Sequence, residues 1–99
     1  MKSNEKTIMH ATINVYGHVQ GVSFRAYTRR KAQELDLKGY VKNLRDGTVL
    51  IEVEGPKDKI KQLYEWAKTS GSPASEVSGA DISWSAQLKN YKIFQIELF

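Results

Sequence analysis

The chain has 99 residues, of which 40% are hydrophobic and ten are aromatic, and it carries a formal net charge of +4. This length predicts one domain with one core over residues 1–99, and the hydrophobic content excludes a disordered chain. Because the sequence contains no cysteine, a disulfide framework, a thiol nucleophile and a thiolate metal site are all excluded.

The N-terminal residues 1–6 are polar, and the apolar stretch of a signal peptide does not follow them. No part of the sequence reaches the roughly 20 consecutive apolar residues that a membrane helix requires. We therefore expect a soluble, cytoplasmic protein with no membrane partner. We also expect a monomer.

Positive charge is concentrated in residues 21–46, which contain seven Lys or Arg and three Asp or Glu. The rest of the chain contains eight of each sign. This distribution predicts an anion-attracting face near residues 21–46. On composition alone, a solvated helix face remains the alternative.

Apolar and polar residues alternate over residues 9–15, which predicts a half-buried strand. A Gly-His-Val-Gln-Gly sequence at 17–21 interrupts the strand, because its two glycines permit turns that other residues avoid. A 3.6-residue period then predicts a helix over 24–35. Gly39 ends the helical region and opens a second strand over 40–44.

The Asp-Gly pair at 46–47 predicts a tight turn into a third strand, which pairs antiparallel with the second. Pro56 marks the start of a second helix, and Gly71 marks its end. The other expected elements are the third strand over 49–54, a loop over 70–79, and strands over 82–86 and 93–98.

The element order is strand, helix, strand, strand, helix, strand, with one extra strand. This order is typical of the ferredoxin-like split βαβ sandwich, a fold of the α+β class. We expect an antiparallel sheet of four to five strands with the two helices on one face. Because this fold supports unrelated activities, function has to be inferred from a site.

The turn between the first strand and the first helix is the first candidate site. Backbone N–H groups at a helix start lack helical acceptors and lie at the positive end of the helix dipole, so they favour an anion. Arg25 lies in the first helical turn, from where its guanidinium could hold two oxygens of a phosphoryl group. The alternative is a glycine-rich connection followed by an ordinary surface arginine.

Asn43, at the end of the second strand, is the second candidate. In the split pattern the third strand lies between the first two, so the ends of those two strands reach the same rim and Asn43 can face the loop. An amide offers a donor and an acceptor, which allows it to hold a water molecule and a ligand oxygen together. The alternative is an Asn that bonds its own backbone before the hairpin turn.

Both segments resemble the signature of the acylphosphatase family. The first matches over Gly17-x-Val19-Gln20-Gly21-Val22-x-Phe24-Arg25, and the second over Gly39-Tyr40-Val41-Lys42-Asn43, followed by Gly47, Thr48, Val49 and Gly55. A Gly-Ser-Pro sequence at 71–73 extends the similarity over nearly the whole chain. The family's ferredoxin-like domain agrees with the element order derived above.

The resemblance implies an enzyme that hydrolyses the carboxyl-phosphate bond of acyl phosphates to a carboxylate and inorganic phosphate. It also implies that Asn43 orients the attacking water and that Arg25 binds the phosphoryl group. In some relatives the C-terminal carboxylate approaches this arginine, and here that carboxylate belongs to Phe99. The loop residues implied in phosphoryl binding are Gly17, His18, Val19, Gln20, Gly21, Val22, Ser23 and Phe24.

The sequence predicts neither a metal nor another cofactor. Phosphoryl transfer depends mainly on positioning and charge stabilisation, and an acyl phosphate already has a good leaving group in its carboxylate. The acids nearest the two motifs are Glu34, Asp36 and Asp46, which we expect on the far half of the helix and in the hairpin turn. We therefore expect metal-independent activity.

Several other residues are expected to have structural or surface roles. His18 is expected to be exposed in the loop, and His10 to lie on the strand surface. Trp66 and Trp84 are expected to pack in the core or at its edge. For Ser23, a side-chain cap on the helix is the first expectation, and a phosphate contact is the alternative.

Two other functions remain open. Four-stranded sheets with two helices bind RNA and this chain is basic, but its third strand, residues 48–54, has no aromatic side chain for base stacking and carries two acids. We therefore expect no nucleic-acid partner. A ligand-sensing regulatory domain without turnover is not excluded by the motifs.

Overall fold

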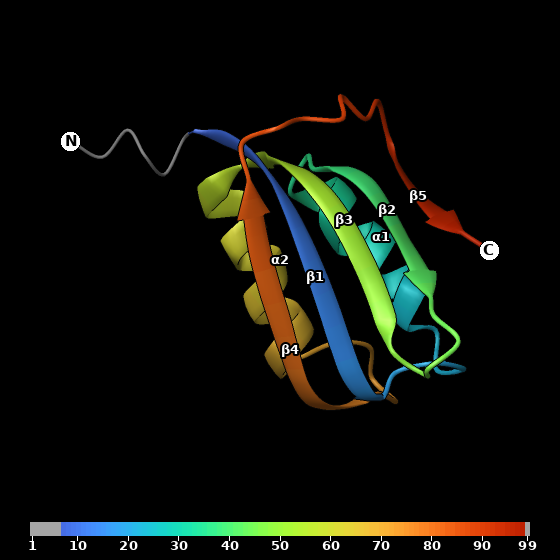
Figure 1. Ribbon diagram of the computed structural model, residues 1–99. Helices are drawn as coiled ribbons and strands as arrows, with labels where there is room; N and C mark the ends of the chain where they lie inside the picture. The colour runs from blue at the N-terminus through green and yellow to red at the C-terminus, as the bar shows by residue number, and fades with distance from the viewer. Residues whose placement is uncertain (1–6, 99) are drawn as a thin grey trace.

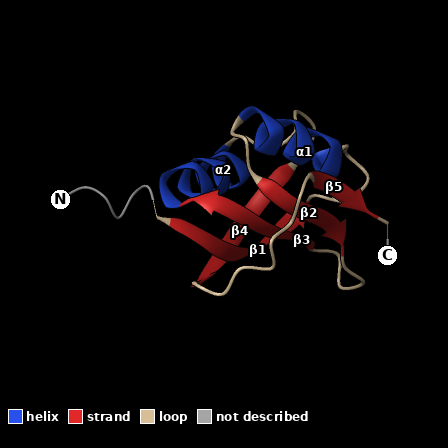
Figure 2. Ribbon diagram, turned by 90° about the horizontal axis from the view of Figure 1, so that it is seen from above, coloured by secondary structure: helices blue, strands red, loops and turns tan. Residues whose placement is uncertain are grey.

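The computed structural model describes residues 7–98 and forms one five-stranded sheet with two helices packed on one of its faces (Figures 1 and 2). Over this range neither helix is long and apolar enough to cross a membrane. The strand order across the sheet is β4-β1-β3-β2-β5. The elements are β1 (Ile8–His18), α1 (Phe24–Glu34), β2 (Lys38–Asn43), β3 (Val49–Pro56), α2 (Lys57–Thr69), β4 (Glu76–Ser85) and β5 (Phe94–Glu97).

The predicted α+β ferredoxin-like class is confirmed, with two differences in detail. β5 pairs with β2 in parallel, so the sheet is mixed rather than wholly antiparallel. In addition, β4 begins at Glu76, within the predicted loop, because its pairing with the end of β1 continues through residues 76–79.

β1 and β2 flank β3, and both run antiparallel to it. They are therefore parallel to each other, and their C-terminal ends lie at the same rim of the sheet (Figure 1). His18 ends β1, and Asn43 ends β2. This topology, together with α1 starting directly after the β1 loop, brings the two predicted motifs to one place.

The core lies between the sheet and the helices and consists of alternate strand residues and one stripe of each helix. Ile13 of β1 is opposite Ile51 of β3, and Val15 is opposite Val49. All four are completely buried. Trp66 and Trp84 are partly buried and pack against this core, as predicted. The helix contributions to the core are Phe24, Thr28 and Ala32 from α1 and Ile60, Leu63 and Ala67 from α2.

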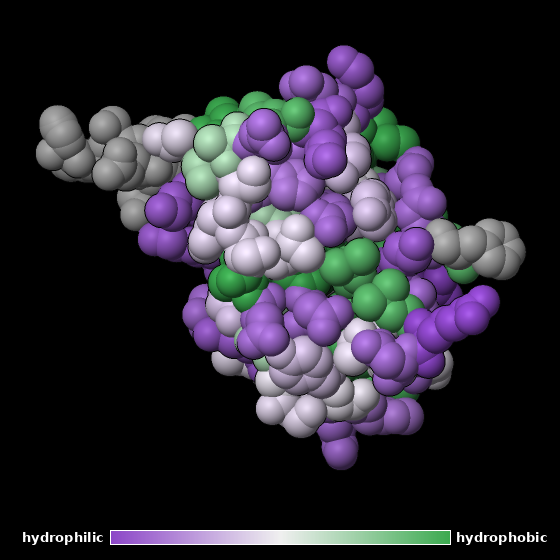
Figure 3. Space-filling view, in the orientation of Figure 1, coloured by the Kyte–Doolittle hydropathy of each residue, from purple (hydrophilic) through white to green (hydrophobic). Residues whose placement is uncertain are grey.

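The opposite face of the sheet carries no helix and is mainly hydrophilic, with a hydrophobic band across its middle (Figure 3). The prediction that His10 lies on the strand surface is wrong, because this residue is only 6% exposed. The connection from β4 to β5 passes over the end of this face where β1 begins (Figure 1). In that connection, the ring of Tyr91 lies 5.9 Å from the His10 ring. The hydrophilic face is therefore partly covered by the chain itself.

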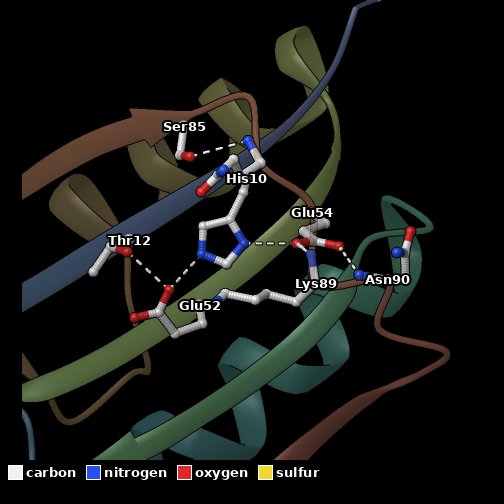
Figure 4. A network of polar contacts seen from close by, with 8 residues as sticks. His10, Thr12, Glu52, Glu54, Ser85, Lys89 and Asn90 are labelled. Atoms are coloured by element: carbon white, nitrogen blue, oxygen red, sulfur yellow. Dashed lines mark hydrogen bonds and ion pairs between the residues drawn. The ribbon is translucent and has the colours of Figure 1, made fainter.

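Two carboxylates flank His10 on this face (Figure 4). Its Nδ1 lies 2.7 Å from Glu54 Oε2, and its Nε2 lies 2.7 Å from Glu52 Oε1. Glu54 also accepts hydrogen bonds from the backbone N–H groups of Lys89, at 2.6 Å, and Asn90, at 3.0 Å. This network attaches the β4–β5 connection to the sheet, and that connection positions β5.

Candidate active site

The loop between β1 and α1 has a backbone shape that its glycines make possible. Gly17 has φ +119, and a Cβ there would collide with the carbonyl oxygen of Glu76 in β4. Gly21 has φ +77, but a Cβ there would meet nothing within 4 Å. Gly17 is therefore needed for close packing against β4, whereas Gly21 is needed for its positive φ, which other residues rarely adopt.

Two side-chain contacts hold the loop in place. The amide of Gln20 donates to the carbonyl oxygens of Leu44, at 2.8 Å, and Thr48, at 2.9 Å, in the β2–β3 turn. Ser72, which is buried, donates from Oγ to the carbonyl oxygen of Val22 at 2.9 Å. The loop is thus fixed on one side to the turn that follows Asn43 and on the other to the segment after α2.

The predicted capping role of Ser23 is wrong. Ser23 stands before α1 in the left-handed region, with φ 63, and its side chain makes no capping hydrogen bond. Its carbonyl oxygen accepts the first helical bond, from the N–H of Tyr27 at 3.1 Å. Ser23 instead lines the cavity described next.

A cavity of about 340 Å³ opens at this rim, between the loop, the start of α1 and the ends of β2 and β5. Arg25 is half-buried in its wall, and its Nη1 donates to the carbonyl oxygen of Glu97 in β5 at 3.4 Å. Within residues 7–98, Arg25 makes no ion pair with a carboxylate. The residues that line the cavity are Val19, Gly21, Ser23, Phe24, Arg25, Ala26, Asn43 and Ile96.

Asn43 lines this cavity and carries a buried acceptor. Its Oδ1 is inaccessible and accepts no hydrogen bond from any residue between 7 and 98. A buried amide oxygen without a donor costs about 1 to 3 kcal/mol, so such atoms are rare away from functional sites. The alternative that Asn43 bonds its own backbone does not account for this oxygen.

Asp46, by contrast, acts within the β2–β3 turn. Its carboxylate accepts hydrogen bonds from the Thr48 hydroxyl at 2.7 Å and from the Thr48 N–H at 3.0 Å. These two bonds lower the pKa of Asp46 below its ordinary value, the hydroxyl bond having the larger effect. Among residues 7–98, no group of three His, Cys, Asp or Glu side chains could hold a metal ion.

The structure brings most of the predicted site residues together. Of the predicted set, six line the cavity: Arg25, Asn43, Val19, Gly21, Ser23 and Phe24. Among the described residues, four others of that set do not line it: Gly17, His18, Gln20 and Val22. His18 is exposed, as expected. The expectation about the carboxylate of Phe99 lies outside the described residues.

Sequence reasoning missed two lining residues. Ala26 follows Arg25 in the first turn of α1, and the helix period could have indicated it. Ile96 comes from β5 and reaches the cavity through the parallel pairing with β2, in which it is opposite Val41. No local sequence signal predicts that pairing.

Fold and cavity together define a small ferredoxin-like domain with an arginine and an amide at the rim of its sheet. The family model described as acylphosphatase matches residues 11–96. The chain therefore belongs to the acylphosphatase family of hydrolases.

Individual relatives support this assignment. An acylphosphatase of Salinibacter ruber is 38% identical over 90 residues, which cover 91% of this chain and 94% of that protein. One from Archaeoglobus fulgidus is 44% identical over 84 residues, covering 85% and 92%. The crystal structure of acylphosphatase from Bacillus subtilis superposes with a TM-score of 0.87 at 37% identity and covers 90% of this chain and 98% of that one.

Proposed function

We propose that the protein hydrolyses the carboxyl-phosphate bond of acyl phosphates, with Arg25 and residues 17–24 binding the phosphoryl group and Asn43 orienting the attacking water. Water adds to phosphorus, the bond from phosphorus to the acyl oxygen breaks, and a carboxylate leaves. The proton of the water passes to phosphate or solvent. Membership of the acylphosphatase family supports the reaction.

Arg25 is suited to the phosphoryl group by its position and chemistry. It follows the loop at the start of α1, where the N–H groups of the first turn have no helical acceptor. A planar guanidinium presents two parallel donors to two phosphoryl oxygens, and it stabilises the charge that these oxygens carry in the transition state. Its bond to Glu97 O, at 3.4 Å, fixes one side of the guanidinium while leaving other donors available.

The observation that carries the proposed mechanism is the buried Asn43 Oδ1 without a donor, in the same cavity as Arg25. Because this oxygen is inaccessible in the structure, we propose that the amide turns toward the cavity when substrate binds. There the oxygen accepts a hydrogen bond from the attacking water and directs the lone pair of the water toward phosphorus. Because the leaving group is the weakly basic carboxylate of an acyl phosphate, the reaction needs no strong general acid. An uncharged amide that positions the water is therefore sufficient for this hydrolysis.

We propose that the protein acts as a cytoplasmic monomer on a small-molecule acyl phosphate, releases inorganic phosphate, and uses no metal or other cofactor. We also propose that the protein binds neither a nucleic acid nor a membrane. The outward side chains of the central strand β3 include Glu52 and Glu54, which bind His10 and would repel a nucleic-acid backbone.

The test separates binding from chemistry with Arg25→Ala and Asn43→Ala, assayed by benzoyl phosphate hydrolysis and by the rise in Tm that phosphate produces. Phosphate at a hundredfold excess over its Kd should stabilise the wild type by about 2.7 kcal/mol. Arg25→Ala should lose both stabilisation and turnover. Asn43→Ala should keep the stabilisation but lose turnover by on the order of a hundredfold.

Arg29→Ala is the control, because Arg29 is an exposed arginine one turn further along α1. It should keep turnover and phosphate stabilisation close to those of the wild type. Circular dichroism first establishes that each variant is folded. If folded Asn43→Ala lost phosphate stabilisation as fully as Arg25→Ala, Asn43 would be a phosphate ligand; if it kept full turnover, it would have no catalytic role.

A further inference from the structure

The active-site cavity has a polar side and an apolar wall. The loop, Arg25 and Asn43 supply the polar side, and Ile96 of β5 contributes to the wall. Val19 and Phe24 also line the cavity, but each is only 1% exposed and has almost no side-chain surface to offer a ligand. Ala26 offers a single methyl group. Within the described residues, Ile96 is therefore the large aliphatic side chain in the lining that still has surface available.

The position of Ile96 follows from the parallel attachment of β5. Phe94 and Ile96 point to the same face because side chains alternate along a strand. Phe94 is buried in the core, whereas Ile96 is only partly buried. Ile96 is opposite Val41, which lies two residues before Asn43 on the same face of β2, and the next carbonyl, that of Glu97, accepts from Arg25. The side chain thus lies beside both proposed functional groups.

We propose that Ile96 contacts the acyl group of the substrate and makes the enzyme prefer acyl phosphates with an apolar acyl group. This inference rests on the function proposed above. The phosphoryl group occupies the loop and Arg25, so the acyl group is the part of the substrate that remains to meet the wall. An aliphatic side chain favours a benzoyl or branched alkyl group over acetyl because it buries more apolar surface with the larger group.

The test is the ratio of kcat/KM for benzoyl phosphate to kcat/KM for acetyl phosphate. In Ile96→Ala this ratio should fall by about tenfold or more, since one missing methylene in an apolar pocket alters specificity by roughly 10- to 200-fold. Acetyl phosphate hydrolysis should fall less than benzoyl phosphate hydrolysis, because the single methyl group of acetyl buries less apolar surface against Ile96. Phosphate-induced stabilisation should persist, because phosphate has no acyl group. Ile93→Ala is the control: it makes the same change next to β5, at an exposed position outside this cavity.

Ile96→Val and Ile96→Thr keep the test valid if the alanine variant folds poorly. Valine and threonine have nearly the same shape, but threonine has a polar hydroxyl group where valine has a methyl group. The threonine variant should therefore have the lower ratio, because its wall is less apolar. A ratio unchanged across all three variants, or an equal fall for both substrates, overturns the inference. Failure of the wild type to hydrolyse either substrate refutes the proposed function instead.

Discussion

Glu54→Gln is a sharp test of the network on the open face of the sheet. In the native side chain, Oε2 accepts from the His10 ring and from the Lys89 N–H, and Oε1 accepts from the Asn90 N–H. Glutamine has the same shape, but its NH₂ must replace one of these oxygens and then face a donor. The substitution therefore removes the charge and at least one hydrogen bond without leaving a cavity.

The expected loss follows from these three contacts. A hydrogen bond to a charged group contributes about 1.5 to 3 kcal/mol and a neutral one about 0.5 to 1.5 kcal/mol. Losing the charge from three buried bonds should therefore lower the free energy of unfolding by about 3 kcal/mol at pH 7. For a domain of this length, that corresponds to a fall in Tm of more than about 10 °C.

The effect should depend on pH in one direction. Burial alone would raise the pKa of Glu54, but the hydrogen bonds from the Lys89 N–H, the His10 ring and the Asn90 N–H outweigh it and hold the pKa below the ordinary value of 4.5. A carboxyl with a lowered pKa stabilises the fold above its unfolded pKa, and this contribution is lost as the pH falls through its folded pKa. The difference in stability between the wild type and Glu54→Gln should therefore shrink as the pH falls below the ordinary value of 4.5.

Urea unfolding of both proteins at pH 7 and at pH 3 measures the difference directly. Glu34→Gln is the matched control, because the Glu34 side chain is 57% exposed and its nearest cationic nitrogens, on Arg30 and Lys31, lie 3.9 Å away. It should change stability by less than about 0.5 kcal/mol. A Glu54→Gln effect that is below 1 kcal/mol at pH 7, or equal at both pH values, would refute this reasoning.

Three further predictions concern the active site. Arg25→Lys should retain less than about a tenth of wild-type kcat/KM, because a point charge replaces a planar fork; greater retention would count against bidentate binding. Gln20→Glu should destabilise the domain by about 1 to 3 kcal/mol in urea unfolding, since a carboxylate cannot donate to the carbonyls of Leu44 and Thr48. Gln62→Glu, at an exposed position of α2, is its control and should have little effect. Activity in excess EDTA should equal activity with added magnesium, and a loss that a divalent ion restores would reveal a metal site.

Much of this architecture could be predicted from the sequence because it depends on local patterns. Alternation predicted β1, the 3.6-residue period predicted α1, Pro56 and Gly71 marked the two ends of α2, and the Asp-Gly pair placed the β2–β3 turn. The proximity of Arg25 and Asn43 followed from topology. Because β3 is antiparallel to both β1 and β2, those two strands are parallel and end at the same rim of the sheet. Sequence-based prediction of the fold succeeded for elements whose pairing fixes the direction of the neighbouring strand.

The features that were missed depend on contacts between distant segments. The burial of His10 depends on a connection almost 80 residues later in the chain, and no signal within β1 indicates it. The parallel pairing of β5, and with it the place of Ile96, depends on how that connection crosses the sheet. Ser23 looked like a helix cap by residue type, but its left-handed backbone turns the hydroxyl away from that role.

The loop contacts also have a consequence for folding kinetics. Three hydrogen bonds that shape the active site join residues far apart in sequence: Gln20 to Leu44 across 24 positions, Ser72 to Val22 across 50, and Arg25 to Glu97 across 72. Closing such long loops is slow, and contacts of high sequence separation dominate the folding time of mixed α/β domains. A chain with its helices and central hairpin already formed would still lack a complete site. Recovery of activity during refolding should therefore lag behind recovery of helical circular dichroism.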